Sequence, residues 1–155
     1  MGAVADRDCP VDEDGVGSEE SSDPQAVFVG MHLTVEDMDA SLAFYRRLGL
    51  SVPDLEPGGT HVEINVGGVI FVSLSTVELT ESYDPGYRPR NLPPGSVMQF
   101  HLAGVGGVDR LYADMTAAGY HGHLAPFDAF WGNRYAEIDD PDGNVVGIHG
   151  PLPPS

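Results

Sequence analysis

A chain of 155 residues, 41% of them hydrophobic, is long enough for one domain with its own core. The formal net charge is −17 and all seven basic residues are arginine, so the surface should repel phosphate backbones and nucleic-acid binding is not expected. A single cysteine excludes an internal disulfide framework. No apolar run approaches the roughly 20 residues that cross a membrane, and the first residues lack a signal-peptide core, so we expect a cytoplasmic protein.

Residues 1–25 are rich in Asp, Glu, Gly and Ser and have almost no large apolar side chains. Such a segment cannot bury enough apolar surface to offset the entropy of ordering, which predicts a disordered acidic tail. Residues 27–150 should then form the folded domain.

The first half of this domain begins with period-two alternation over residues 27–35, which predicts a strand with one apolar face. Apolar side chains then recur at helical spacing from Met38 to Tyr45, and Gly49 follows as a stop signal. Short strands are expected over residues 50–53, 60–66 and 69–75, with Gly67 and Gly68 in a hairpin turn.

The second half repeats this order. Residues 97–103 have the pattern of a strand, and residues 108–115 that of an amphipathic helix that stops at Gly119. Strands follow at about 121–125, 133–139 and 144–149. An offset of 70 residues carries the helix that ends before Gly49 onto the helix that ends before Gly119. We therefore expect an α+β (α/β) fold of two βαβββ modules, residues 27–75 and 96–150, joined by a connector over 76–95.

Two segments carry a family resemblance: VEDMDASLAFYRRLGL (35–50) and FWGNRYAEIDDPDGNVVGIHG (130–150). They resemble the first strand–helix segment and the closing hairpin of the vicinal-oxygen-chelate superfamily, which includes glyoxalase, extradiol dioxygenases and bleomycin-resistance proteins. The likeness around Trp131 is strongest to the bleomycin-resistance type. The resemblance implies curved mixed sheets that surround a pocket, and it implies a homodimer, because many relatives dimerise.

Catalytic members of that superfamily bind a divalent metal ion through His and Glu side chains at four strand positions. The family motifs place these positions at Gly30, Phe71, Phe100 and Gly147. None of the four side chains can bind a cation. The resemblance therefore implies a protein without this metal site, and no cofactor is expected.

A shifted site remains an alternative. His32 shares a strand face with Gly30, and His149 shares one with Gly147. A one-residue slip in the turn that follows His101 would bring His101 to the third position. Three imidazoles could then bind a metal ion, although the repeat register places His101 opposite Phe100.

Without a metal, the pocket should be aromatic, with a few polar contacts. This combination is typical of sites for flat organic ligands, and the acidic body would favour a cationic one. The expected ligand-binding residues are Phe28, Gly30, His32, Glu63, Phe71, Phe100, Phe127, Phe130, Trp131, Gly147 and His149.

Two functions fit this site. The first is a binding protein, with no catalytic residues, that sequesters an aromatic or cationic antibiotic. The second is a lyase, isomerase or dioxygenase-type enzyme of secondary metabolism with His32, Glu63 and His149 as acid–base groups. The arginine beside the aromatic loop, Arg134, is expected to pair with Glu137 or Asp139. The connector, which carries Tyr83, Tyr87, Arg88 and Arg90, is expected to be a surface linker, with a mobile flap as the alternative.

Overall fold

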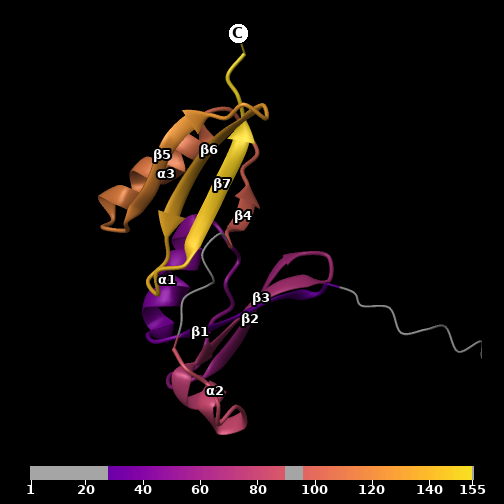
Figure 1. The fold of residues 1–155 in the computed structure, drawn as a ribbon, viewed down its shortest axis with the longest axis vertical. Coiled ribbons are helices and arrows are strands. Elements are labelled where there is room, and N and C mark those ends of the chain that lie inside the picture. Colours follow the sequence, from indigo (N-terminus) through magenta and orange to yellow (C-terminus); the bar gives the residue numbers. More distant parts are fainter. Residues whose placement is uncertain (1–27, 90–95, 155) are drawn as a thin grey trace, which may run out of the picture.

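The protein folds into two modules, each with a mixed sheet and a helix (Figure 1). The structure is a computed structural model and describes residues 28–89 and 96–154. The acidic tail lies outside these residues. In the part of the chain that is described, no helix is long and apolar enough to cross a membrane.

The first module contains strand β1 (Gly30–Val35), helix α1 (Met38–Leu48) and the hairpin of strands β2 (His61–Gly67) and β3 (Ile70–Thr76). The sheet order is β1-β3-β2, with β1 parallel to β3 and β2 antiparallel to it. The expected strand over 50–53 does not form. This segment bends back, with the backbone N–H of Val52 donating to the carbonyl of Leu50, and Pro53 has no N–H to offer a sheet.

The second module contains strand β4 (Met98–His101), helix α3 (Gly107–Ala117) and strands β5 (Gly122–Asp128), β6 (Asn133–Asp139) and β7 (Val145–Pro151). The sheet order is β4-β7-β6-β5, with β4 parallel to β7. The parallel pair of the first module, β1 and β3, therefore corresponds to β4 and β7. The expected α+β repeat is confirmed, and the second sheet has one more strand.

The connector is not only a linker. Helix α2 (Val77–Tyr83) follows β3 directly, and its first turn is capped because the Thr76 side chain accepts a hydrogen bond from the backbone N–H of Leu79. The Thr80 hydroxyl is hydrogen bonded to that of Thr34, 3.0 Å away, so α2 is held beside β1.

Each sheet has a core face and an open face. In the first sheet Leu33, Ile64 and Leu74 point to the core and are at most 4% exposed. In the second, Ala136, Ile138, Val146 and Ile148 pack with Val108 and Met115 of α3. Strand residues alternate between faces, so His32, Ser73, Tyr135 and His149 lie on the open faces.

Helix α1 joins the modules. Its N-cap Asp37 accepts a hydrogen bond from the Ala40 N–H, and Gly49 ends it with a φ of 105°. Although α1 belongs to the first module, it lies at the lower end of the second sheet, where it contacts α3 and the turn before β7 (Figure 1). Phe44 packs edge-on against Tyr120, with ring centroids 5.0 Å apart, and Arg47 forms a two-bond ion pair with Asp114 of α3.

The deepest contact between the modules is polar. The buried hydroxyl of Tyr45 on α1 donates to Asp140 Oδ2, 2.9 Å away, in the turn before β7. The other oxygen of Asp140 accepts from the backbone N–H groups of Asp142 and Asn144. Asp140 thus stabilises its own turn and also holds α1. Burial, and then the nearby Asp140 charge, raise the pKa of Tyr45, so its hydroxyl stays a donor.

Gly30 is required by a close approach of two strands. It pairs with Phe71 on β3, and a side-chain carbon added at Gly30 would overlap the carbonyl oxygen of Phe71. That oxygen belongs to the backbone and cannot rotate away, so the site admits only glycine without a shift of the strands.

We expect Tyr45→Phe to lower the free energy of unfolding by about 1.5–3 kcal/mol, because it removes a hydrogen bond to a buried carboxylate. Urea denaturation measures this change. Tyr83→Phe is the control, since its exposed hydroxyl is 3.5 Å from His32, and it should cost less than about 0.5 kcal/mol. Equal losses in both variants would contradict the anchoring role of Tyr45.

We expect Gly30→Ala to destabilise the fold by about 1–3 kcal/mol through overpacking between β1 and β3. Gly86→Ala is the matched control, because a side chain there would meet only the Asp84 carboxylate, at 3.3 Å. Thermal unfolding of the two variants compares them directly. A Gly30→Ala protein as stable as the control would show that the strands separate without cost.

Candidate functional site

The open face of the first sheet is polar. His32 Nδ1 is hydrogen bonded to Ser73 Oγ at 2.9 Å, and His61 Nδ1 to Ser75 Oγ at 2.8 Å. The two imidazoles are nearly parallel, with centroids 6.3 Å apart. Burial, and then the neighbouring His61, lower the pKa of His32. At neutral pH His32 is therefore an uncharged donor and acceptor.

Three expected residues of this sheet lie near the histidines. Gly30 and His32 are on one face of β1, and Phe71 is the register partner of Gly30. Glu63 is exposed, and its carboxylate is 3.9 Å from His61 Nε2. Phe28 precedes β1. Its side chain is 68% exposed and does not pack in the core.

The connector adds a residue that the sequence did not single out as part of the site. The hydroxyl of Tyr83 on α2 is 3.5 Å from His32 Nε2. Tyr83 is 60% exposed, so this part of the connector lies on the surface and also reaches the edge of the open face. Tyr87 and Arg88 lie in the turn that follows α2, and Arg90 lies outside the described residues.

In the second sheet the register of β4 against β7 differs by one residue from the register that the 70-residue offset predicts. Gln99 pairs with Gly147, Phe100 with Ile148, and His101 with His149. Placing Phe100 in the site was therefore wrong: it packs against the core beside Ile148, which has no exposed surface. The segment from Gln99 to Gly119 is one residue longer than the corresponding segment from Gly30 to Gly49. His101 is therefore on the open face, with its ring 5.0 Å from that of His149.

The residues at the four positions of the superfamily's metal ligands do not fit a metal ion. They are Gly30, Phe71, Gln99 and Gly147, and none of them has an ionisable or imidazole side chain. A side-chain carbon at Gly147 would lie 2.7 Å from the hydroxyl oxygen of Tyr135, so the tyrosine fills the space of the fourth ligand. His32, His101 and His149 do not converge either: among the described residues they belong to no group of three possible ligands.

Tyr135 lies at the centre of the second open face. Its hydroxyl donates to Glu137 Oε1 at 2.8 Å. Burial, together with this bond, raises the pKa of Tyr135 to about 12. The hydroxyl therefore remains protonated, and it offers a fixed polar group beside Gly147, the position of the fourth ligand of the superfamily's metal.

An aromatic group surrounds Tyr135. Phe127 and Trp131 contact its ring edge-on, with centroids 5.9 and 5.5 Å away, and Phe130 contacts Trp131 at 4.9 Å. Phe127, Trp131 and Phe130 are 37%, 48% and 97% exposed. The loop from Phe127 to Trp131 thus presents apolar rings to solvent, next to the open face that holds Gly147 and His149.

Arg134 holds this loop against α3. Its guanidinium pairs with Asp109 on α3 at 2.6 Å and with Asp128 at 2.8 Å. The expected pairing with Glu137 or Asp139 was wrong, because the side chain of Arg134 is directed to the face of the sheet that α3 covers.

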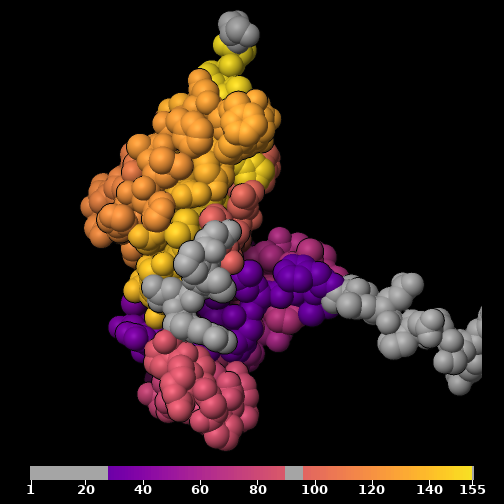
Figure 2. Space-filling view, viewed as in Figure 1, coloured from indigo at the N-terminus to yellow at the C-terminus, as the bar shows by residue number. Residues whose placement is uncertain are grey.

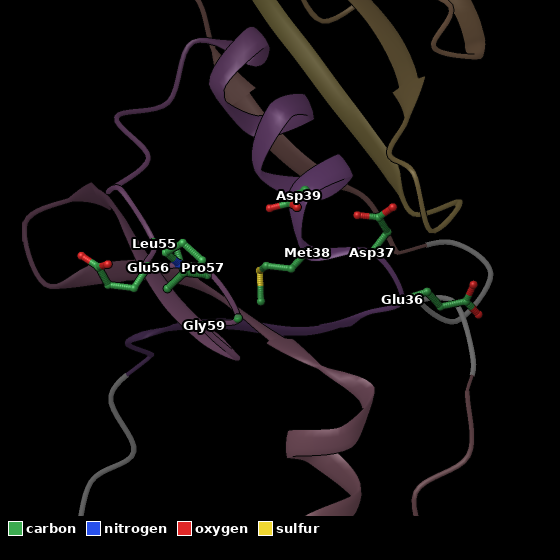
Figure 3. A pocket seen from close by; sticks show the side chains of 9 residues that line it. Glu36, Asp37, Met38, Asp39, Leu55, Glu56, Pro57 and Gly59 are labelled. Carbon is green, nitrogen blue, oxygen red and sulfur yellow. The ribbon is translucent and has the colours of Figure 1, made fainter.

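A hollow of about 550 Å³ lies elsewhere, between the start of α1 and the loop 55–59 (Figure 3). Figure 3 shows Asp37, Met38 and Asp39 on one wall and Leu55 to Pro57 on the other. None of the expected ligand-binding residues lines this hollow, so it is separate from both open faces.

Comparison with solved structures shows the same fold. A hypothetical protein, SA1046, from S. aureus is 20% identical with a TM-score of 0.66, and the match covers 82% of this chain and 94% of that one. A glyoxalase-related enzyme from Fulvimarina pelagi is 18% identical with a TM-score of 0.67, covering 82% and 88%. A glyoxalase/bleomycin resistance protein/dioxygenase from Nocardioides is 21% identical with a TM-score of 0.61, covering 87% and 89%.

No curated protein matches the chain significantly. At the sequence level, the model of one protein family matches residues 26–148, which span the first module, the connector and the second module up to the middle of β7. The repeated strand–helix–hairpin order, the register of the parallel strand pairs and this match agree. The chain belongs to the Glyoxalase/Bleomycin resistance protein/Dioxygenase superfamily.

Proposed function

We propose that this protein is a cytoplasmic binding protein that sequesters an aromatic or cationic small molecule, an antibiotic in particular, without a metal ion at the superfamily's ligand positions. The observation that carries the proposal is the aromatic group on the second open face, in which Phe127, Phe130 and Trp131 are exposed around the buried ring of Tyr135. Rings exposed in this way offer edges and faces for stacking with a flat ligand.

The residues around the aromatic group support a binding role. Gly147 leaves room on the sheet for the Tyr135 ring, and the Tyr135 hydroxyl lies directly beside it. His149 and His101 add imidazole nitrogens on the same face. A mainly apolar surface with a few fixed polar groups is the usual composition of a small-molecule site.

Charge supports the choice of ligand. The net charge of −17 creates a negative potential that raises the local concentration of cations. An aromatic surface also attracts cations, because the ring faces carry negative charge. The ligand class is therefore a planar molecule with a positive charge.

A metal-free enzyme of secondary metabolism, of the lyase, isomerase or dioxygenase type, is the second candidate. The observation that favours it is His32, which is neutral and contacts Ser73 and the Tyr83 hydroxyl. An imidazole with a lowered pKa can accept a proton. The two candidates differ in one respect: the binding protein returns its ligand unchanged, and the enzyme does not.

We expect Trp131→Leu to weaken binding of a planar cationic antibiotic at least tenfold, which corresponds to about 1.4 kcal/mol or more of lost stacking. A panel of intercalating antibiotics, with bleomycin included, provides the probes. Trp131 is the single tryptophan of the chain, so its fluorescence reports binding in the wild type. Equilibrium dialysis measures the variant.

Val105→Ala is the control for this experiment, because Val105 is similarly exposed (47%) but lies in the turn before α3. Mass spectrometry of the recovered antibiotic separates the two candidates. Saturable binding with an unchanged ligand supports sequestration, and a new product supports the enzyme. If no member of the panel binds, the sequestration proposal is wrong.

We further propose that two copies of the chain form a homodimer through an exposed arm, defined as residues 28–30 and 66–70. Phe28, Val29, Val69 and Ile70 in this arm are 68%, 46%, 72% and 40% exposed. Figure 2 shows the arm projecting sideways from the body of the molecule. A contiguous apolar surface of this kind indicates a protein contact.

We expect Val69→Asp to convert the dimer to a monomer at micromolar concentration, because a charge would be buried in the contact. Analytical ultracentrifugation measures the mass. Val105→Asp, which changes another exposed valine, should leave the dimer intact. A wild-type protein that sediments as a monomer would overturn the dimer proposal.

A further inference from the structure

Three side chains converge at the edge of the second sheet. His121 and His123 lie at the start of β5, and Asp139 ends the neighbouring strand β6. Asp139 Oδ2 is 2.7 Å from His121 Nδ1, and Asp139 Oδ1 is 3.1 Å from His123 Nδ1. We propose that His121, His123 and Asp139 form a binding site for a divalent transition-metal ion of the Zn²⁺ class.

The local backbone explains why these residues meet. Residues two apart on a strand point to the same face, so both imidazoles project from one side of β5. The backbone N–H of Asp139 donates to the carbonyl of His121, 2.9 Å away, which places the carboxylate beside the rings. One ligand atom from each side chain lies within 4.8 Å of the other two. Among the described residues, no other group of three or more His, Cys, Asp or Glu side chains brings its ligand atoms this close together.

The carboxylate itself points to a missing ligand. Asp139 Oδ1 is buried and has no hydrogen-bond partner among the described residues, because the approach of the His123 ring is not aligned for a hydrogen bond. A buried carboxylate oxygen without a donor costs free energy, and native structures usually satisfy such atoms with a protein group, a water molecule or an ion. A cation placed between Asp139 and the imidazoles would satisfy this oxygen.

Glu137 is placed to orient one of the imidazoles. Its Oε2 is 3.8 Å from His123 Nε2, on the far side of the ring from Asp139. A carboxylate there favours the tautomer with the proton on Nε2, which leaves the Nδ1 lone pair free for the metal. The other oxygen of Glu137 accepts from Tyr135, so the orienting carboxylate is itself held in place.

The ligand atoms select the kind of ion. Two imidazole nitrogens and one carboxylate oxygen suit Zn²⁺, Ni²⁺, Co²⁺ or Cu²⁺, whereas Mg²⁺ and Ca²⁺ prefer oxygen ligands alone. Zinc bonds of about 2.0–2.1 Å in a tetrahedron separate the ligand atoms by roughly 3.3 Å. The observed separations of 2.7 and 3.1 Å reach that value by small side-chain rotations, because His121 and His123 are 74% and 46% exposed.

The proposed site differs from the superfamily's metal position. That position uses residues of β1, β3, β4 and β7, whereas this site uses β5 and β6. None of its three ligands belongs to the aromatic group, so loss of antibiotic binding in Trp131→Leu would not remove it. Three protein ligands leave at least one coordination position open for water or another ligand.

Isothermal titration of Zn²⁺ into the full-length, tag-free, EDTA-treated chain tests the proposal. We expect one ion per chain with a micromolar or lower Kd. His121→Gln, His123→Gln and Asp139→Asn should each weaken binding at least about tenfold. His61→Gln is the matched control, because His61 is also a part-exposed imidazole near a carboxylate (43% exposed, 3.9 Å from Glu63), and it should change nothing.

A second measurement does not depend on the stability of the variants. In histidine-detected NMR of the wild type, substoichiometric Zn²⁺ should shift the imidazole resonances of His121 and His123 and leave those of His32, His101 and His149 unchanged. The proposal is overturned if no Zn²⁺ binds up to millimolar concentration. It is also overturned if binding survives in His123→Gln, or if the shifts occur at the open-face histidines.

Discussion

The carboxylate of Asp140 connects the two halves of the molecule. It accepts hydrogen bonds from the turn that contains it, through the N–H groups of Asp142 and Asn144, and from the Tyr45 hydroxyl of the other module. Only 4% of Asp140 is exposed, so these donors replace water. Because the partner on α1 is a single phenol, the position of this helix on the second sheet depends on a directional contact as well as on apolar packing.

Asp142, from the same turn, strengthens this junction. It accepts from the backbone N–H of Glu36 at 3.0 Å and from the Ser41 hydroxyl at 3.3 Å. Burial raises the pKa of the Asp142 carboxyl. The turn before β7 therefore binds both the residue that precedes α1 and the first turn of α1. These bonds orient the first module relative to the second sheet. Both open faces derive their relative placement from this junction.

The two open faces have different chemistry although they are related by the repeat. His32 and His101 occupy equivalent places, since each is two residues after the residue that faces the metal position. Their neighbours differ: Ser73 bonds to His32, whereas His149 lies beside His101. In the second module Tyr135 then fills the space at Gly147, so the position that corresponds to a superfamily metal ligand is the base of an aromatic surface. Side chains that do not have to converge on one metal ion can differ between the two modules.

The amino-acid sequence by itself determined the repeat, the helix that ends at Gly49, the hairpin at Gly67 and Gly68, and the absence of ligand side chains at Gly30, Phe71 and Gly147. Periodicity and turn chemistry are local properties, so they can be read along the chain. The tertiary structure decided which face Phe100 occupies, because a one-residue difference in a loop reverses every side chain of the strand before it. It also decided the partners of Arg134, the reach of Tyr83 toward His32, and the meeting of His121 and His123 with Asp139. Those contacts join residues from different elements, and only the pairing of strands and the packing of helices sets the distances between them.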